Sequence, residues 1–514
     1  MNKFKIKLNG KEIEAEEGRT IFEVADANGI FIPTLCHHED FEHKANCRVC
    51  CVEINGRRNL AMACATKITE GMEITTDSER VKKSRNLNIE MIFAEHIEKC
   101  ATCIWRVNCK LLDLADRYKI LLTTFKDRKG KRKIYKFANA VELDGTQCID
   151  CRNCIDACSK MQKINHLKVV GKGSEQEIMP DKSGNTDCIY CGQCALHCPV
   201  GAAQEQAGWE DVEKDLKYPD KVKAVLISTA TLVSVLEEFK METTESSIKK
   251  VIAAIKKLGF NYVYDDGLAN AIYALNAAKE IIKRPKKDFP LFTSYCPAWV
   301  KYVSFYQPDL SDHLLRLKSP QLEGGRMIKS YLAKIHTTHP SSISLTLINQ
   351  CTSSKYDIMS RGDITIKHSI TTRELAWLIK KNRIDINELA EEEINRLIDN
   401  DFRAVLGAES GGGIELISSA LEYLSKKSKN DKLKKSSKLR YLAVNGIGNI
   451  KEALEARNNY DLIEVASCPD GCAGGGGGPI PTNEKLRKER VERLKKFYKN
   501  NIDWKYIDNI KKYA

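Results

Sequence analysis

Residues 148–158 read CIDCRNCIDAC, and residues 188–199 read CIYCGQCALHCP. Each segment spaces four cysteines as C-x2-C-x2-C-x3-C, the spacing of thiolate ligands to [4Fe-4S] clusters. In such paired runs the fourth cysteine ligates the cluster of the other run. We therefore expect two clusters in a domain over residues 138–210, with paired zinc sites as the alternative. The predicted ligand sets are Cys148, Cys151, Cys154 and Cys198, and Cys188, Cys191, Cys194 and Cys158.

Cysteine is concentrated in the N-terminal part of the chain. Of the 20 cysteines among 514 residues, 16 lie at or before Cys198. The sequence has no apolar stretch of the ~18–20 residues that a membrane span needs, and its first residues lack the apolar block of a signal peptide. We therefore expect a cytoplasmic location. Because reducing conditions there disfavour disulfides, the clustered cysteines indicate metal ligands.

The N-terminal region, predicted as a domain over residues 1–80, combines a hairpin, a helix and a cysteine loop. Residues 3–8 and 11–16 alternate polar and apolar side chains around Asn9-Gly10, which predicts a β-hairpin. Thr20 and Glu23 form a capping-box pattern for a short helix. The cysteines that follow resemble a plant-type [2Fe-2S] ferredoxin site with a longer first gap. The predicted ligands are Cys36, Cys47, Cys50 and Cys64, and Cys51 is interpreted as a small buried side chain.

A histidine and three cysteines lie within a predicted module over residues 81–125: His96, Cys100, Cys103 and Cys109. One imidazole and three thiolates can bind zinc or a [4Fe-4S] cluster, and the spacing alone leaves both open. The neighbouring cluster motifs favour iron–sulfur. One [2Fe-2S] and three [4Fe-4S] clusters would then form a relay that carries single electrons between an external partner and a site of chemistry.

From about residue 215, strand and helix patterns alternate, which predicts an α/β architecture with largely parallel sheets. Helices are predicted at 246–258 and 268–282, and strands at 222–228, 260–264, 289–293, 344–348, 402–406, 439–444 and 462–465. The four remaining cysteines follow predicted strands, where α/β folds build their sites. They are Cys296, Cys351, Cys468 and Cys472. Five glycines after Cys472 predict either a flexible loop or a close backbone approach to a cofactor.

Three segments around these cysteines resemble the signature segments of modular [FeFe]-hydrogenases. They read TSYCPAW at 293–299, QCTSSK at 350–355 and SCPDGCAGGGGGP at 467–479. The order of the N-terminal cluster motifs also matches, so the resemblance covers nearly the whole chain. It implies a hydrogenase-like domain over 215–480 and a charged tail over 481–514 that resembles the hydrogenase small-subunit segment. The N-terminal motifs are also similar to those of the large iron–sulfur subunit of respiratory complex I.

The resemblance implies a specific cofactor and reaction. Cys296, Cys351, Cys468 and Cys472 would bind a [4Fe-4S] cluster, and Cys472 would bridge it to a diiron centre that carries CO, cyanide and a dithiolate. This H-cluster would require diiron-assembly maturation proteins. The implied activity is reversible interconversion of protons and electrons with H2. Electrons would pass to or from a ferredoxin or a flavoprotein.

The residues around the implied H-cluster depart from the family pattern. The proton-relay cysteine is replaced by Tyr295, whose reference pKa of ~10 makes it a poorer relay near neutrality than a thiol at ~8.5. The lysine that hydrogen-bonds a cyanide falls on Ser354, with Lys355 one residue later, and a pocket methionine falls on Ala466. We expect the H-cluster to be retained and turnover to be low, with a bare [4Fe-4S] site or an empty pocket as the alternative.

Other functions remain open at this point. An H2 or redox sensor could use the same cofactor with a separate output partner, and a non-catalytic electron-transfer subunit would explain the N-terminal modules alone. The net charge of +13 and the lysine-rich stretch 426–438 suggest nucleic-acid binding as a further possibility. We expect none, because cysteine-ligated clusters carry negative charge that offsets much of this basicity.

Overall fold

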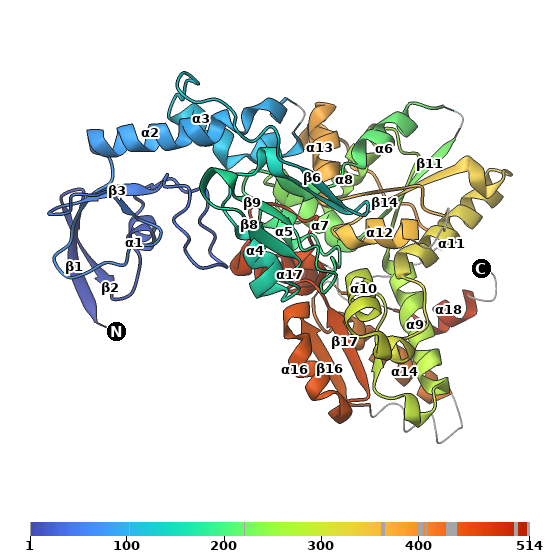
Figure 1. Cartoon of the computed structure of the whole chain (residues 1–514). Helices are drawn as coiled ribbons and strands as arrows, with labels where there is room; N and C mark the ends of the chain where they lie inside the picture. Colours follow the sequence, from blue (N-terminus) through green and yellow to red (C-terminus); the bar gives the residue numbers. More distant parts are fainter. Residues whose placement is uncertain are drawn as a thin grey trace.

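The computed structural model describes residues 2–101, 103–219, 221–360, 365–397, 404–407, 409–427, 439–497 and 502–510. No helix in these ranges is long and apolar enough to cross a membrane. The N-terminal sheet lies at one end of the molecule and the large α/β part at the other, with the cysteine-run domain between them (Figure 1). Only the first two residues of the lysine-rich stretch 426–438 are within the described residues.

The N-terminal domain is a mixed five-stranded sheet of order β2-β1-β5-β3-β4, packed on α1. The predicted hairpin is confirmed, with Ile6 opposite Ile13. The capping box is also confirmed, because the Thr20 hydroxyl accepts from the Glu23 N–H and the Glu23 carboxylate accepts from the Thr20 N–H. The elements are β1 (Lys3–Leu8), β2 (Lys11–Glu16), α1 (Ile21–Ala27), β3 (Cys51–Ile54), β4 (Ala61–Met62) and β5 (Glu73–Thr75).

Two helices, α2 (Glu79–Ala94) and α3 (Lys110–Arg117), connect this domain to the next. Arg85 on α2 is 2% exposed and donates to the carbonyls of Val49, Cys51 and Thr76 at 3.2, 3.0 and 3.1 Å. Since charged donors make stronger hydrogen bonds than neutral ones, this side chain fastens α2 to the cysteine loop of the first domain.

The cysteine-run domain pairs two short helices with small antiparallel sheets. Helices α4 (Asn153–Asp156) and α5 (Gln193–Leu196) each begin between the second and third cysteines of a run, and they pack against each other. Its strands are β6 (Ile134–Phe137), β7 (Val141–Asp144) and β10 (Ala203–Glu205), and the hairpin β8 (Leu167–Val170) and β9 (Glu177–Pro180).

The C-terminal part contains two parallel sheets, of order β12-β11-β14-β15 and β13-β17-β16, which confirms the predicted α/β class. The strands are β11 (Val222–Ile227), β12 (Tyr262–Asp265), β13 (Leu291–Phe292), β14 (Ile343–Ile348), β15 (His368–Ile370), β16 (Tyr441–Asn445) and β17 (Leu462–Ala466). Helices surround both sheets. They are α6 (Trp209–Leu216), α7 (Thr229–Glu238), α8 (Glu245–Lys257), α9 (Gly267–Lys283), α10 (Pro297–Tyr306), α11 (Pro320–Ile335), α12 (Thr352–Ser360), α13 (Thr372–Lys381), α14 (Gly412–Lys427) and α16 (Ile450–Glu455).

The strand predicted at 402–406 is wrong for its described portion. Residues 402 and 403 lie outside the described residues, and Ala404–Leu406 is a loop. Ala404 and Leu406 are buried and Val405 is half-buried, and Val405 and Leu406 line a cavity instead of pairing in a sheet. The chain then turns at Gly407, whose φ of +68° is a left-handed conformation that favours glycine.

The charged tail folds onto the protein as α17 (Glu484–Phe497) and α18 (Trp504–Ile510). Arg490 is 1% exposed and forms a bidentate pair with Glu237 on α7, at 2.6 and 2.9 Å. Arg487 bridges Asp470 at 3.0 Å and Asp40 at 2.6 Å. Helix α17 therefore ties the loop after β17 to the N-terminal domain.

Candidate active site

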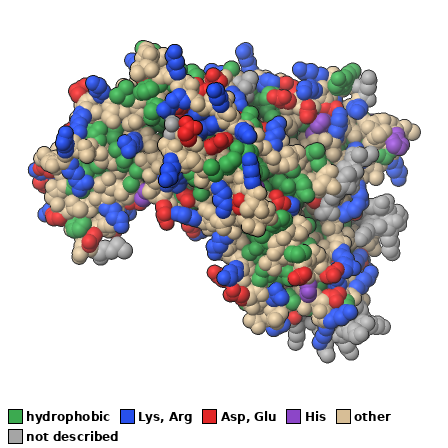
Figure 2. All heavy atoms as spheres, viewed as in Figure 1, with side chains coloured by type: hydrophobic (Ala, Val, Ile, Leu, Met, Phe, Trp, Pro, Cys, Tyr) green, Lys and Arg blue, Asp and Glu red, His purple; other side chains and the backbone are tan. Residues whose placement is uncertain are grey.

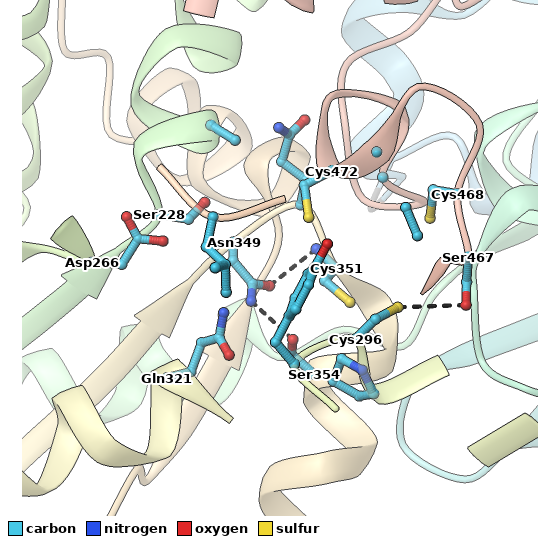
Figure 3. A pocket seen from close by; sticks show the side chains of 18 of the residues that line it. Ser228, Asp266, Cys296, Gln321, Asn349, Cys351, Ser354, Ser467, Cys468 and Cys472 are labelled. Carbon is cyan, nitrogen blue, oxygen red and sulfur yellow. Dashed lines mark hydrogen bonds between the residues drawn. The ribbon is translucent and has the colours of Figure 1, made fainter. Parts of the chain in front are cut away.

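The four C-terminal cysteines converge on one cavity. Cys296 follows β13 at the start of α10, Cys351 follows β14 at the start of α12, and Cys468 and Cys472 follow β17. All four line the same cavity (Figure 3). The parallel strands bring them together, because their carboxyl ends open toward a shared crevice.

Burial disfavours ionisation of three of these thiols in the protein alone. It raises the pKa of Cys351 to about 11 and the pKa values of Cys468 and Cys472 well above their usual range, and the neighbouring cysteines raise them further. A buried cysteine set of this kind ionises only with a cationic partner, since a bound metal deprotonates the thiols that coordinate it. A metal centre at these cysteines would therefore have to supply the positive charge that offsets their burial.

The spacing of the sulfur atoms disfavours single zinc ions. Tetrahedral zinc with Zn–S bonds of ~2.3 Å brings its sulfur ligands to within about 3.8 Å of one another. Among the described residues, no three cysteine sulfurs lie within 4.8 Å of each other. The described group whose ligand atoms all lie within 4.8 Å of one another consists of His38, Asp40 and His197. The carboxylate of Asp40 already forms an ion pair with Arg487. In the described part of the chain, no three cysteine sulfurs are thus as close together as the ligands of one tetrahedral zinc ion.

The first cysteine group falls into two pairs. The sulfurs of Cys50 and Cys64 are 3.3 Å apart, and the Cys47 N–H donates to the Cys36 sulfur at 3.5 Å. The hydrogen bond with the Cys47 side chain lowers the pKa of Cys36 to about 6. Two thiolates for each of two irons is the arrangement that a [2Fe-2S] cluster needs. Cys51 lies apart, with its buried thiol 3.8 Å from the Val81 carbonyl, in a packing position.

Cysteines of the two runs lie close enough to influence one another. Burial raises the pKa of Cys154 well above its usual range, and Cys151, Cys148 and Cys198 raise it further. In the same way, burial and then Cys191 and Cys158 raise the pKa of Cys194. Cys194 also contributes to the raised pKa of Cys154, and Cys198 to that of Cys194, so the two runs form one cysteine cluster and the crossed ligand sets stay a prediction.

His96 is buried near the cysteine-run domain. Its Nδ1 lies 2.7 Å from the Gln147 carbonyl oxygen, which fixes Nδ1 as the protonated nitrogen and leaves Nε2 as the ligand atom. A histidine that binds a metal is commonly oriented by such a bond. Cys109 contributes to the raised pKa values of both Cys100 and Cys103 after burial, so the three predicted cysteine ligands lie together.

Tyr295 lines the cavity, but its hydroxyl points to a buried acid. It donates to Glu464 Oε1 at 2.6 Å, and Glu464 also accepts from the Gly411 and Ile414 N–H groups. The ring fits because two glycines face it. A Cβ at Gly407 or Gly413 would lie 2.8 or 2.9 Å from the Tyr295 ring.

Ser354 and Ala466 line the cavity as predicted, whereas Lys355 is not among the lining residues. The Ser354 hydroxyl accepts from Asn349 Nδ2 at 3.0 Å. Lys355 turns away: its ammonium group lies 2.7 Å from Glu374 and 2.6 Å from the Gln206 carbonyl, and both charged side chains are buried. Lys355 therefore joins α12 to α13 and to the segment after β10.

Replacing Lys355 with methionine is expected to lower the free energy of unfolding by about 3–5 kcal/mol. The variant leaves the Glu374 carboxylate buried without its cation, and removing one partner of a buried pair costs this much. Urea unfolding under anaerobic conditions measures the loss. The double variant Lys355→Met/Glu374→Gln should recover part of it. Equal stability of wild type and Lys355→Met would contradict a buried pair.

The cavity also contains polar residues that sequence reasoning missed. Ser228, Thr229, Asp266, Asn270 and Gln321 come from the ends of β11 and β12 and from α7, α9 and α11. Their position in the sequence could have identified two of them, because Ser228 ends one predicted strand and Asp266 closely follows another. Asp266 is the residue among them that can hold or release a proton.

Comparison with known families agrees with this geometry. Residues 221–476 match the model described as "Iron only hydrogenase large subunit, C-terminal domain". Residues 2–79 match a 2Fe-2S iron-sulfur cluster binding domain, and residues 147–202 match a 4Fe-4S dicluster domain. Residues 85–121 match the NADH-ubiquinone oxidoreductase-G iron-sulfur binding region.

Individual relatives cover nearly the whole chain. The NADP-reducing hydrogenase subunit HndD of Solidesulfovibrio fructosivorans is 31% identical over 96% of this chain and 92% of its own. Iron hydrogenase 1 of Clostridium pasteurianum is 29% identical over 95% and 91%. A solved [FeFe]-hydrogenase HydA1 from Chlamydomonas reinhardtii shares the fold, with a TM-score of 0.51 and 22% identity over 60% of this chain and 93% of its own. The chain therefore belongs to the iron-only, or [FeFe], hydrogenase family of iron–sulfur oxidoreductases.

Proposed function

We propose that this protein interconverts protons and electrons with H2 at an H-cluster held by Cys296, Cys351, Cys468 and Cys472, with Cys472 as the bridging ligand. The observation that supports it is the convergence of these four cysteines, from three separate loops, on one buried cavity. The bound cofactor would supply the metal at which H2 is formed or split. The protein holds it, excludes water and moves protons.

The polar groups of the cavity fit a cofactor with polar diatomic ligands. Gln350 is 2% exposed, and neither its Nε2 nor its Oε1 has a hydrogen-bond partner. The Oε1 atom of Gln321 is also unpartnered. Buried polar atoms without partners are rare in proteins and indicate a missing ligand. An amide N–H can donate to a cyanide, so the residues present fit the diiron centre of this family.

The relay of electrons would end at this cavity. Cys191, from the second cysteine run, is itself one of the lining residues. The Thr352 hydroxyl donates to the Tyr190 carbonyl at 2.7 Å, and the Gln193 amide donates to the Gly474 carbonyl at 2.7 Å. The glycines after Cys472 allow this approach, because a Cβ at Gly476 would clash with the Cys191 carbonyl oxygen and the Gly192 backbone. We place the second [4Fe-4S] cluster directly beside the H-cluster.

The outer end of the relay would serve a ferredoxin or a flavoprotein. The relative from Solidesulfovibrio fructosivorans is named as a subunit of an NADP-reducing hydrogenase, which is consistent with a flavoprotein partner. On the face shown in Figure 2, basic and acidic side chains are interspersed, without the single-sign area that a nucleic-acid backbone would need. A cytoplasmic location is consistent with the many reduced thiols.

Anaerobic maturation with the diiron-assembly proteins is expected to produce the infrared bands of metal-bound CO and cyanide, together with measurable H2 production. The unmatured protein is the control and should show neither. Absence of the bands after maturation would contradict the H-cluster and would favour an electron-transfer subunit with a bare [4Fe-4S] site.

A second candidate function is an H2 or redox sensor with a separate output partner. Two observations favour it: Lys355 is turned away from the cavity, and the Tyr295 hydroxyl is bound to Glu464. Both changes predict slow turnover with the cofactor still bound. Strong CO and cyanide bands that respond to H2, combined with negligible turnover, would support the sensor.

A further inference from the structure

Asp266 is an acid in the wall of the cavity that holds the four cysteines. It stands between the end of β12 and the start of α9, is 6% exposed, and lines the cavity together with Ser228 and Thr229. In Figure 3, Asp266 and Ser228 lie on one side of the cavity and the cysteines on the other. Position alone therefore makes Asp266 a candidate for proton transfer toward the cofactor.

Hydrogen bonds fix the orientation of this carboxyl group. Its Oδ1 accepts from the Thr229 N–H at 3.0 Å and from the Thr229 hydroxyl at 2.8 Å. The Asn270 side chain also lies beside it, and the Asn270 amide donates to the Ala404 carbonyl at 3.0 Å. With both Thr229 bonds on Oδ1, Oδ2 is the oxygen that can carry a proton.

The surroundings favour the protonated acid. Burial raises the pKa of Asp266, and the hydrogen bonds from Thr229 and Asn270 offset only part of this effect. The largest contributions to the pKa of Asp266 include no cation. A neutral carboxylic acid is a hydrogen-bond donor, whereas a carboxylate is only an acceptor.

Tyr295 does not compete for this role, because its hydroxyl proton is committed to Glu464. Glu464 is itself buried, but it is not among the residues that line the cavity. Of the titratable carboxyl groups in the described part of the chain, Asp266 is the one in the cavity wall.

We propose that Asp266 is the proton donor and acceptor of this pocket, in place of the residue at position 295. The inference deepens the proposed function and rests on it. In the direction of H2 formation, the Oδ2–H bond breaks and the proton enters the cavity, while the relay clusters supply the electrons. The carboxylate then takes up a proton from water. In the direction of H2 oxidation, the carboxylate accepts a proton and later releases it to water.

The variant Asp266→Asn tests the donor role. The amide keeps the size of the side chain and an oxygen for Thr229, but it has no acidic proton. We expect H2 production by the matured protein to fall by roughly 10²-fold, the lower range for a positioned acid–base group. The iron content and the number of CO and cyanide bands should stay unchanged. The control is Asp265→Asn, the adjacent carboxyl group, which binds the Gly267 N–H at 2.9 Å and does not line the cavity.

A second readout needs no diiron centre. Infrared spectra of the unmatured protein in H2O and D2O should contain the carbonyl stretch of a protonated carboxylic acid that disappears in Asp266→Asn. The variant Glu464→Gln should leave that band in place. A spectrum unchanged by Asp266→Asn would overturn the proposal, as would a fully active Asp266→Asn protein with intact CO and cyanide bands. If the matured wild-type protein shows no CO and cyanide bands, the proposed function fails, and the donor role of Asp266 fails with it.

Discussion

Cys472→Ser is expected to abolish the CO and cyanide bands and to reduce H2 production to the background of unmatured protein. Cys472 is proposed as the ligand shared by the [4Fe-4S] cluster and the diiron centre, and serine replaces a soft thiolate by a hard hydroxyl oxygen that binds iron–sulfur centres poorly. Infrared spectra and H2 assays on the matured variant measure both losses.

The N-terminal clusters provide the control for this variant. Their ligands lie on other loops, so the electron paramagnetic resonance signals of the reduced relay should match those of wild type. Cys51→Ser is a matched variant, because Cys51 is a buried cysteine in a packing position. It should keep the bands and the activity. CO and cyanide bands of full intensity in Cys472→Ser would contradict the bridging assignment.

Tyr295→Cys is expected to raise H2 production by roughly 10²-fold, because a positioned acid–base group contributes about 10²–10⁴ to a rate. Burial raises the pKa of Tyr295 well above its usual range, and the Glu464 carboxylate raises it further. The phenol is therefore a poor proton relay at neutral pH. A thiol has a lower reference pKa, and the smaller side chain leaves its proton facing the cavity. Steady-state H2 assays measure the change.

Two companion variants separate proton transfer from the space that the ring occupies. Tyr295→Val removes the ring without supplying an acid, so it should not raise the rate. An equal increase in Tyr295→Val and Tyr295→Cys would show that the bulk of the ring limits turnover. If Tyr295→Cys shows no increase, proton transfer at position 295 does not limit turnover, either because Asp266 already delivers the proton or because the changes at Ser354 or Ala466 are limiting. Loss of the aromatic ring should also cost about 3–5 kcal/mol of stability in each variant, which urea unfolding can check.

Most of the fold could be predicted from the sequence because its signals are local. Alternation around Asn9-Gly10 predicted the hairpin, and Thr20 with Glu23 predicted the capping box. Apolar runs separated by helical patterns predicted the parallel sheets. The strand predicted at 402–406 shows where such signals fail. An apolar run has the same sequence pattern whether it forms a strand or lines a cavity. Only the tertiary contacts of Val405 and Leu406 distinguish the two.

The sequence by itself determined the predicted metal ligands and their predicted grouping, because thiolate spacing within a loop is a property of a few consecutive residues. The tertiary structure decided where the surrounding side chains point. Lys355 binds Glu374, Tyr295 binds Glu464, and Asp266 faces the four cysteines. These outcomes depend on partners far away in the chain, since a buried polar side chain turns toward whichever group can satisfy it. The proposed ligands could thus be predicted from the sequence, but the proton chemistry proposed around them required the fold.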